Sequence, residues 1–505
     1  MAQDLVLAID IGTGSVRAAA VDLAGRIIHV VSREHDQIVP QFGWAEQRAA
    51  AWWDGVVSTI RSLAGAVEHL QDRIAAICAC GQMHGTVLLD AEGRLTRETV
   101  PLWNDKRTTA LVEDFEARHR PQDYLRDSGN PATPAWPAFK LAWLREHDPR
   151  AYARTRNVLM PKDFVNYRLT GIAAMDPGDG SLSFLMDPAT GTWSDRMAVL
   201  LGLDIGMLPD LRQPLEILGS LTADAAALTG LRAGTPVLVG GADYPVALLG
   251  SGVCRPGLAS DVTGTSCIIT VISERPLLDP EICNVATIEG GWGAFMLLET
   301  GGDAVRWGRR ALHDGRADYA AIMDRAAAAP AGADGLLFLP YLTGERLGAS
   351  RNVRAQFFGL SAGHGLAHLD RALVEGVAFA ATHSLRLMAA AAGHAIERVV
   401  ASSGASKSDL WLKIKASAYN VPVLVPEEPE CGIVGCAAMA ATALGHYATL
   451  GAAVAGCVRH RGEILPDPAW AERYARLQPI FDAVTAHSRG PQAQALYDAL
   501  DRISH

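Results

Sequence analysis

Residues 5–22 read LVLAIDIGTGSVRAAAVD, and this stretch decides how the chain begins to fold. An apolar run ends in Asp10, a glycine and hydroxyl turn follows, and a second apolar run begins at Val16. The pattern predicts strand, tight turn and strand. Backbone NH groups and hydroxyls in such a turn suit an anion, while Asp10 suits a magnesium ion held through its water shell. An ordinary hairpin turn is the alternative.

The chain repeats this outline at residues 259–270, ASDVTGTSCIIT. Asp261 again precedes a turn of glycine and hydroxyl residues, and an apolar strand follows. A dinucleotide-binding fingerprint is excluded for the first hairpin, because its third glycine is missing and a strand follows where that motif requires a helix. Two facing domains would need one such hairpin each to bind a polyphosphate from both sides. The position of one hairpin in each half of the chain predicts two domains, residues 1–248 and 249–505.

A single carboxylate interrupts the apolar run of residues 237–250, VLVGGADYPVALLG. The run predicts a strand that ends in a glycine turn, with Asp243 just beyond it. Side chains at the carboxyl end of a strand in an open α/β sheet face the crevice where ligands bind. Asp243 is therefore a candidate catalytic group. The alternative is an aspartate that caps a helix beginning near Pro245.

Three further loops carry side chains that are candidates to line a ligand site. His84 lies between two glycines after a buried strand, although a lone histidine is more often structural. Trp103 precedes an amide and several charges, a mixture that can stack on a sugar ring and pair with its hydroxyls. A helix start capped by Asn104 or Asp105 is the alternative there. Trp136 lies in a proline-rich loop, which is equally expected to form the wall of a pocket or to be an ordinary loop.

Two glycine turns in the second half are candidate nucleotide contacts. Gly301 follows an apolar strand, and a backbone turn there can approach a ligand closely. The segment 402–408, SSGASKS, opens a helix whose amino terminus could receive a nucleotide. A simple cap by Ser406 or Ser408 is the alternative. The chain has no Gly-Lys-Ser or Gly-Lys-Thr, which excludes a Walker-type phosphate loop.

Composition sets the class of protein. The chain has 505 residues, 49% of them hydrophobic and 20% charged, which indicates a globular protein with more than one domain. Its net charge of −10 and the absence of a basic run exclude nucleic acid as an expected partner. Eight scattered cysteines without zinc or redox spacing suit a reducing cytoplasm. No membrane segment or signal peptide is expected.

Several motifs, in this order along almost the whole chain, resemble those of the FGGY family of carbohydrate kinases. Within that family, the Gln82-Met83-His84-Gly85 and Trp103-Asn104-Asp105 motifs look most like the xylulokinase branch. The matching motifs are Asp10–Ser15, Gly43–Gln47, Gly81–Gly85, Trp103–Asp105, Gly240–Asp243, Gly264–Ser266, Tyr341–Arg346, Phe357–Leu360 and Gly404–Ser408.

The resemblance implies an α/β fold of two ribonuclease H or actin-like domains, with ATP and sugar in the cleft between them. It implies Asp243 as the base that accepts the proton of the sugar hydroxyl and Asp10 as the magnesium-site carboxylate. The remaining implied contacts are Thr13, Gly14, Ser15 and Arg17 for the transferred phosphate; Gly264, Thr265 and Gly301 for the nucleotide phosphates; Gly404 and Ala405 for the adenosine; and Met83, His84, Trp103, Trp136 and Tyr244 for the sugar.

The resemblance also implies the reaction, which is phosphorylation of D-xylulose by Mg-ATP in the cytoplasm. Tyr244 stands where xylulokinases usually have Asn, which favours a different pentulose or a polyol, such as ribulose, erythritol or threitol, as the alternative. The segment Leu347–Ala349 lacks the family's usual proline, and Asn420 replaces a common glycine. An actin-like ATPase switch is the alternative from another class. A second copy of the chain is a candidate partner.

Overall fold

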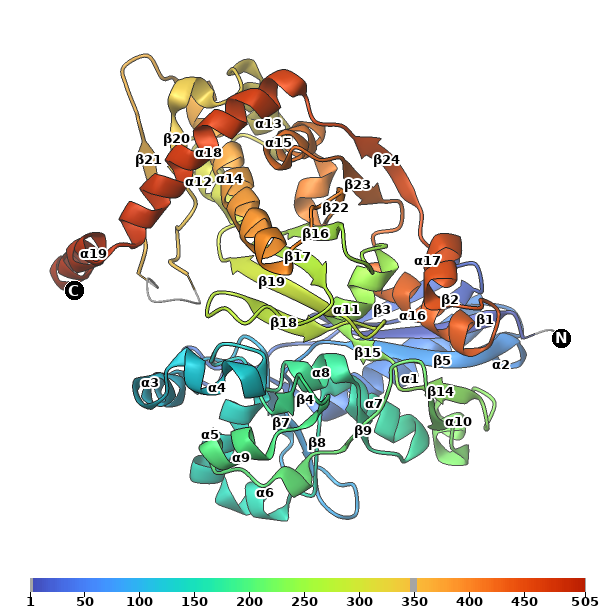
Figure 1. Cartoon of the computed structure of the whole chain (residues 1–505). Coiled ribbons are helices and arrows are strands. Elements are labelled where there is room, and N and C mark those ends of the chain that lie inside the picture. The colour runs from blue at the N-terminus through green and yellow to red at the C-terminus, as the bar shows by residue number, and fades with distance from the viewer. Residues whose placement is uncertain (1–2, 346–351, 505) are drawn as a thin grey trace. The chain divides into compact units, whose positions relative to one another are not determined.

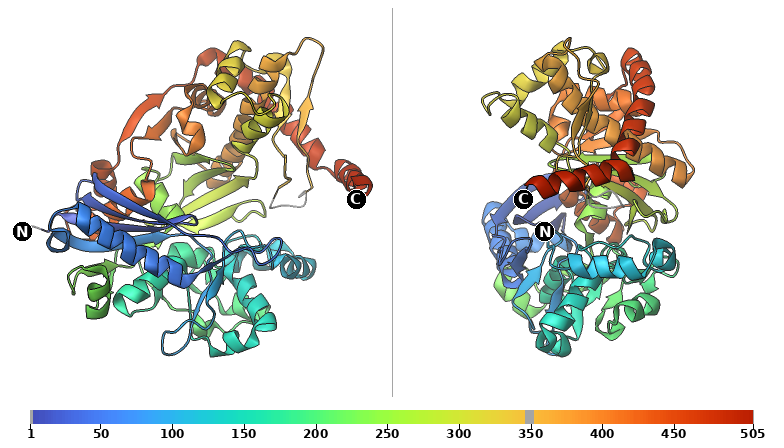
Figure 2. Two further views of the ribbon diagram at one scale, coloured as in Figure 1. Left: turned by 180° about the vertical axis from the view of Figure 1, so that it is seen from behind. Right: turned by 90° about the vertical axis from the view of Figure 1, so that its left-hand side faces the viewer.

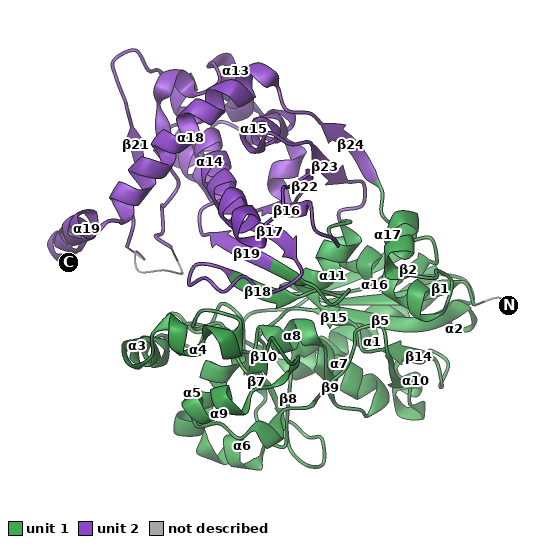
Figure 3. Ribbon diagram, in the orientation of Figure 1, with its two compact units in different colours: residues 1–254, 283–293, 430–459 green, residues 255–282, 294–429, 460–505 purple. Residues whose placement is uncertain are grey.

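The computed structural model describes residues 3–345 and 352–504, which form two compact units. The first unit comprises residues 1–254, 283–293 and 430–459, and the second comprises 255–282, 294–429 and 460–505 (Figure 3). The chain therefore returns to the first unit twice. The division into domains 1–248 and 249–505 stays a prediction.

The first unit is built on a mixed sheet in the order β13-β14-β5-β1-β2-β3 (Figure 1). The antiparallel pairs are β1 with β2, β2 with β3 and β13 with β14, whereas β5 runs parallel to β1 and β14. A short strand, β15, also pairs parallel with β5. The strands are β1 Leu5–Ile11, β2 Ser15–Asp22, β3 Ile27–Glu34, β5 Ile74–Gly81, β13 Ile217–Ser220, β14 Pro236–Leu238 and β15 Gly241–Ala242.

Alternation along β1 divides the core of this unit into two layers. Leu5, Leu7 and Ile9 pack under α1 (Ala49–Ala66), whose apolar residues recur at helical spacing. Figure 2 shows α1 lying along that face. The intervening residues Val6 and Ala8 pack against the opposite layer. That layer consists of α11 Asp243–Gly250, α16 Cys431–Ala443 and α17 Leu450–Cys457.

The other elements of the first unit are short. They are β4 Glu46–Arg48, α2 Leu70–Arg73, β6 Val87–Leu89, β7 Thr99–Pro101, α3 Thr109–Arg118, α4 Pro121–Ser128, α5 Pro137–His147, α6 Pro149–Arg154, β8 Asn157–Leu159, α7 Pro161–Thr170, β9 Ala174–Met175, α8 Pro177–Ser181, β10 Met186–Asp187, β11 Thr192–Trp193, α9 Asp195–Leu201, η1 Ile205–Met207, β12 Asp210–Leu211, α10 Ala223–Thr229 and β18 Cys283–Ala286.

The second unit repeats the topology of the first. Its strands run in the order β19-β17-β16-β22-β23-β24, in which β16 pairs antiparallel with β17 and parallel with β22. The path β19-β17-β16-β22-β23 thus corresponds to β3-β2-β1-β5-β14. The strands of this sheet are β16 Leu258–Thr263, β17 Cys267–Ser273, β19 Trp292–Leu298, β22 Arg398–Ser402, β23 Val423–Pro426 and β24 His460–Ile464. A separate antiparallel pair is formed by β20 Leu337–Leu339 and β21 Gln356–Phe358.

Helices surround the second sheet, and the long α14 lies centrally in its core. They are α12 Asp303–Ala311, α13 Tyr319–Ala328, η2 Ala333–Gly335, α14 Leu366–Ala392, η3 Gly404–Lys407, α15 Asp409–Tyr419, α18 Pro468–Arg489 and α19 Pro491–Ser504. Within the described residues, no helix has the length and apolar character needed to cross a bilayer.

Most of the predicted elements are present. Both hairpins form, which confirms strand, turn and strand for residues 5–22 and 259–270. The region 173–193 contains the short helix α8 and the short strands β9, β10 and β11. Of the Tyr341–Arg346 motif, only Tyr341–Glu345 is described; Arg346 and Leu347–Ala349 lie outside the described residues.

Candidate active site

Asp243 is the first residue of α11, immediately after strand β15. The strand-end interpretation is therefore correct, and the cap interpretation is wrong, because the N-cap residue of this helix is Ala242. Asp243 keeps partial solvent access, yet surrounding protein raises its pKa to about 8. Desolvation is the main cause, the charge of Asp10 adds to it, and a hydrogen bond with the Tyr244 backbone opposes it.

The sheet brings Asp10 to the same edge. Cys80 of β5 lies opposite Asp10 of β1 on one side and opposite Gly241 of β15 on the other. Two residues after Gly241 the chain reaches Asp243, so the register explains why the charge of Asp10 acts on Asp243. Two carboxylates from distant parts of the sequence thus meet at the carboxyl end of the parallel strands.

Asp10, the expected magnesium-site carboxylate, lies in an ion pair with Arg17. Its Oδ2 accepts a hydrogen bond from Arg17 at 3.2 Å, and Arg17 also lies 3.1 Å from Glu430. Its Oδ1 has a weak contact with the Cys80 thiol at 3.7 Å. Desolvation raises the pKa of Asp10, against the opposing effect of Arg17. Arg17 and the Cys80 thiol thus contact different oxygens of Asp10, and a carboxylate is a hard donor that can hold a magnesium ion through its water shell.

The predicted phosphate turn is tied to the predicted sugar loops. The Thr13 hydroxyl donates to Gln82 Oε1 at 3.1 Å and accepts from the Trp103 indole NH at 3.0 Å. The Thr13 carbonyl accepts from Gln47 Nε2 at 2.6 Å, and Gln82 donates to Gln47 Oε1 at 2.9 Å. Within the turn, Gly12 NH bonds the Ser15 carbonyl at 3.0 Å, and the Gly14 carbonyl accepts a backbone bond.

The structure also brings His84 and Trp136 together. Their ring centroids lie 5.0 Å apart in an edge-on arrangement, and both side chains are largely buried. His84 has a left-handed backbone (φ 69°), and Lys140 Nζ donates to its carbonyl at 2.7 Å. Trp136 is the N-cap residue of α5 and Lys140 lies one turn further on, so the start of one helix contacts both the ring and the backbone of His84. Met83 beside it is half-buried.

Neither Asn104 nor Asp105 caps a helix in the loop at Trp103. The next helix begins at Thr109, with Thr108 before it. Asp105 is buried, accepts from the Ala45 NH at 2.7 Å and pairs with Arg107 at 2.8 Å. The cap interpretation is therefore wrong, and the aspartate holds the loop in place.

The predicted nucleotide residues of the second unit lie close to one another. Gly301 NH donates to the Thr265 carbonyl at 2.8 Å, and Gly302 NH to the Gly264 carbonyl at 2.7 Å. A Cβ at Gly301 would come within 2.4 Å of the Ser266 carbonyl oxygen, so only glycine permits this approach. A Cβ at Gly264 would lie 3.0 Å from Ser403 Oγ.

Gly404 and Ala405 begin the short helix η3 beside these turns. A Cβ at Gly404 would lie 3.7 Å from the Thr263 carbonyl, so the backbones approach closely. The alternative that a serine caps the following helix is correct for Ser408, which accepts from the Trp411 NH at 3.3 Å. Gly404, which is exposed, and Ala405, which is buried, precede this cap, and their contact with a nucleotide stays a prediction.

Asp261, the counterpart of Asp10 in the second unit, has a different role. Its carboxylate is fully buried, pairs with Lys415 at 2.5 Å and accepts from the Tyr419 hydroxyl at 2.6 Å. An ammonium therefore neutralises it. The aspartate of each hairpin thus has a cationic partner, but Asp261 is fully buried with a buried lysine, whereas Asp10 is partly exposed and its partner Arg17 also contacts Glu430.

Sequence reasoning missed several buried polar groups of the first unit. Gln47 and Gln82 connect the phosphate turn to the sugar loops, and Lys140 holds His84. Asp176 and Asp179 lie in a glycine-rich stretch that packs close to α11. They could have been recognised in the sequence as two acids in an otherwise small and apolar segment.

Comparison with known proteins identifies the family. The model of the N-terminal domain of the FGGY family of carbohydrate kinases matches residues 5–250, and the C-terminal domain model matches residues 259–444. Xylulose kinase of Bacillus subtilis (strain 168) is 28% identical over 493 residues, which cover 96% of this chain and 97% of that protein.

Solved structures agree in fold. A xylulose kinase from Rhodospirillum rubrum superposes with a TM-score of 0.88 at 32% identity, covering 96% of this chain and 99% of that one. A gluconate kinase from Lactobacillus acidophilus superposes with a TM-score of 0.90 at 25% identity, again covering 96% and 99%. The predicted two-domain α/β fold is thereby confirmed.

Proposed function

Since the chain belongs to the FGGY family of carbohydrate kinases and is therefore a phosphotransferase, we propose that it transfers the terminal phosphate of ATP to a hydroxyl of D-xylulose. FGGY kinases use ATP as the phosphate donor. The observation that carries the proposal is Asp243, a partly accessible carboxylate with a pKa near 8 that lies at the same sheet edge as Asp10.

Asp243 acts as the general base. The sugar hydroxyl loses its proton to the carboxylate as its oxygen bonds to the terminal phosphorus, and the bond from phosphorus to the bridging oxygen of ADP breaks. A carboxylate with a raised pKa is a better proton acceptor than an ordinary one, and phosphoryl transfer demands mainly alignment and charge neutralisation. Partial access of Asp243 to solvent is required, because the hydroxyl must reach it.

Other residues orient the reactants. Arg17 and the backbone of the turn at Thr13 and Gly14 neutralise phosphate charge, while Gly264, Thr265, Gly301, Gly404 and Ala405 receive the nucleotide. Asp10 holds magnesium, which when bound would neutralise charge on the phosphates. His84 and Trp136 form a rigid edge-on pair on which the sugar can rest, and Trp103 is fixed by its bond to Thr13.

Tyr244 is the reason to test other sugars. It directly follows the proposed base, and its phenol is half-buried. A large side chain at this position changes the space beside the reacting hydroxyl. Ribulose, erythritol and threitol are therefore alternative substrates, and gluconate is included because a structural relative is a gluconate kinase. An actin-like switch has lost its support, since the family is one of carbohydrate kinases.

The test is a coupled assay of ADP release with Mg-ATP and a panel of D-xylulose, D-ribulose, erythritol, threitol and D-gluconate. Phosphorus NMR of the product locates the new ester. We expect D-xylulose to have the highest kcat/KM. A higher kcat/KM with another compound would identify that compound as the preferred substrate in place of D-xylulose. If no compound raised ADP release above the rate without sugar, the proposal would be overturned.

A further inference from the structure

The Thr13 carbonyl, in the predicted phosphate turn, accepts hydrogen bonds from two side chains that are distant in the sequence and that the proposed function does not use. Gln47 Nε2 donates to it at 2.6 Å, and His35 Nε2 lies 3.1 Å from it. Because a carbonyl only accepts, the His35 ring carries a hydrogen on Nε2. The two donors satisfy both lone pairs of the oxygen. Gln47 and His35 therefore determine the direction of the Thr13 carbonyl.

The side chain of Gln47 is itself held in one orientation. Gln47 lies on β4 and is 1% exposed. Its Oε1 accepts from the Trp52 indole NH at 3.0 Å and from Gln82 Nε2 at 2.9 Å. Two donors at one end of the amide identify that end as the oxygen, so the NH2 group must face Thr13.

His35 contacts the turn through its backbone as well as its ring. It follows directly after β3, and its NH donates to the Gly14 carbonyl at 3.1 Å. Ring and backbone thus bind two successive carbonyls of the turn. A substitution of His35 removes the bond from the ring and leaves the bond from the backbone, so the contribution of the ring can be measured by itself.

The direction of the Thr13 carbonyl sets the direction of the next NH group. The peptide group between Thr13 and Gly14 is planar and trans, so the Gly14 NH points opposite to the Thr13 carbonyl and away from Gln47 and His35. Within residues 3–345 and 352–504 this NH has no hydrogen-bond partner. Gly14 is exposed, and none of those residues has an atom within 4 Å of a Cβ added to it. The Gly14 NH is therefore an accessible donor for an anion.

We propose that His35 and Gln47 are positioning residues that orient the Gly14 NH toward the phosphoryl group in transfer. The inference rests on the proposed function, which places that phosphoryl group at the turn. Both side chains act through the peptide group between Thr13 and Gly14. An NH that is already oriented needs no rearrangement as charge develops on the phosphoryl oxygens, so its misdirection should lower kcat more than it weakens nucleotide binding.

The experiment compares His35→Leu, which removes the ring donor, with His35→Gln, whose side-chain NH2 can replace Nε2. Gln47→Glu is a second test, because it keeps the acceptor for Trp52 and Gln82 and removes the donor to Thr13; if it does not fold, the two His35 variants decide. For each full-length variant we measure kcat, ATP KM and sugar KM with the preferred sugar of the panel, the Kd of ADP, and Tm.

We expect His35→Leu and Gln47→Glu to lower kcat about tenfold or more, and His35→Gln to lower it only about two- to threefold. The Kd of ADP should stay within about twofold of the wild-type value, because ADP lacks the phosphate that the Gly14 NH contacts. The control is His29→Leu, which replaces an exposed histidine of β3 and should leave every value unchanged.

An unchanged kcat in His35→Leu would overturn the inference. An equal loss of kcat in His35→Gln would overturn it too, because the shape of the ring and not its donor would then matter. A lower Tm together with weaker binding of ADP would indicate a purely structural role. Absence of sugar-dependent turnover by the wild type would refute the proposed function, and this inference with it; the other outcomes refute this inference alone.

Discussion

At the scale of single residues, Asp243 combines two properties that oppose each other. It must be accessible to a sugar hydroxyl, and it must be surrounded by enough protein and negative charge to become a stronger base. The first residue of a helix at a strand end meets both demands. The Asp243 carboxylate lies at the sheet edge, while β15 and α11 hold its backbone in place.

This arrangement predicts a stability difference for Asp243→Asn that depends on pH. The folded-state pKa of Asp243 is above its unfolded value, so wild-type stability falls as pH rises from about 4 to about 8 and then levels off. The amide does not ionise. The variant should therefore gain stability relative to wild type over this range, by a few kcal/mol at most.

Urea unfolding of both proteins between pH 5 and 9 measures that gain, with the exposed Asp54→Asn as control. A constant difference across the range would show that Asp243 titrates as an ordinary carboxylate.

Lys140 provides a second prediction at this scale. Burial lowers its pKa to about 7, against the raising effect of Asp105 and with a further lowering by Arg107. Its folded-state pKa lies below the unfolded value, so wild-type stability rises as pH increases from about 7 to about 10. Lys140→Met removes the charge and also the hydrogen bond to His84.

The Tm of Lys140→Met relative to wild type should accordingly be highest near pH 6 and fall as the pH approaches 9. Thermal unfolding at both pH values measures this, and the exposed Lys106→Met is the control. Parallel curves for wild type and Lys140→Met would mean that Lys140 does not change its charge over this range.

Local sequence patterns predicted only some of these residues. Asp10, Thr13 and Asp243 were recognisable because each follows an apolar strand and neighbours glycines. Lys140 was not, because its partner, the His84 carbonyl, lies 56 positions away and nothing near Lys140 indicates that contact. Asp179 differs, because two acids in a small and apolar segment are visible in the sequence, but the groups that raise its pKa, such as Asp163, come near it only on folding.

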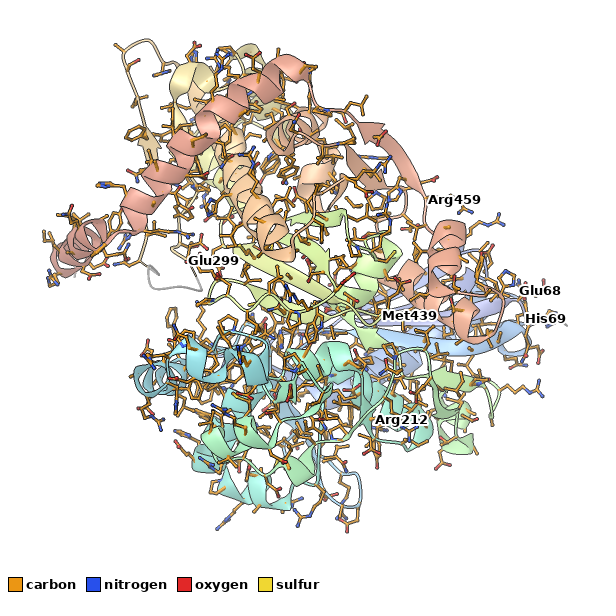
Figure 4. All side chains as sticks on the ribbon, viewed as in Figure 1. Glu68, His69, Arg212, Glu299, Met439 and Arg459 are labelled. Atoms are coloured by element: carbon orange, nitrogen blue, oxygen red, sulfur yellow. The ribbon has the colours of Figure 1, made fainter. Side chains whose placement is uncertain are left out.

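At the scale of elements, the position of α11 depends on close packing against α16. A Cβ at Gly250 would lie 1.8 Å from the Cys431 carbonyl oxygen, and one at Gly435 would lie 2.2 Å from the Val246 carbonyl oxygen. The two helices therefore touch through their backbones. Met439, labelled in Figure 4, belongs to the same α16 and packs in the layer shared with β1.

Gly435→Ala should push α11, and Asp243 with it, away from its place. We expect a lower Tm and a loss of kcat greater than the loss of sugar affinity, because misplacement of the base by even about 1 Å lowers the rate of a positioned reaction strongly. The control is Gly451→Ala in α17, where no atom lies within 4 Å of the added Cβ among the described residues. Equal Tm and activity in both variants would contradict the packing argument.

Elements with strong periodicity were predictable, and short ones were not. The buried strands and the long α14 follow from apolar spacing. Helix α8 has five residues, two of them glycines, and no apolar repeat. Its ends are determined by Asp176, which accepts from two backbone NH groups, and by packing on Pro245.

At the scale of the whole molecule, the chain contains one topology twice, and the two copies have diverged in chemistry. Asp10 and Asp261 occupy equivalent hairpins, yet Lys415 neutralises only the second. The duplication was visible from two short motifs. The different roles of the two aspartates were not, because Lys415 lies 154 residues beyond Asp261.

The discontinuous first unit leads to a prediction about folding. The layer of core under β1 includes Ile433, Cys436 and Met439 of α16, which lie far beyond residue 254. A chain of residues 1–254 would expose that layer and should not fold cooperatively. The same chain with residues 430–459 joined by a flexible linker should recover a cooperative transition, followed by circular dichroism during urea unfolding. Equal cooperativity without residues 430–459 would contradict this account.

The most direct test of the central claim is the rate of sugar-dependent ADP release by Asp243→Asn, relative to wild type, at saturating Mg-ATP. Loss of the general base should lower kcat by about 10²-fold or more, while ADP-induced thermal stabilisation stays the same. The account predicts this loss with the preferred sugar of the panel. Release by the variant at the wild-type rate would contradict it.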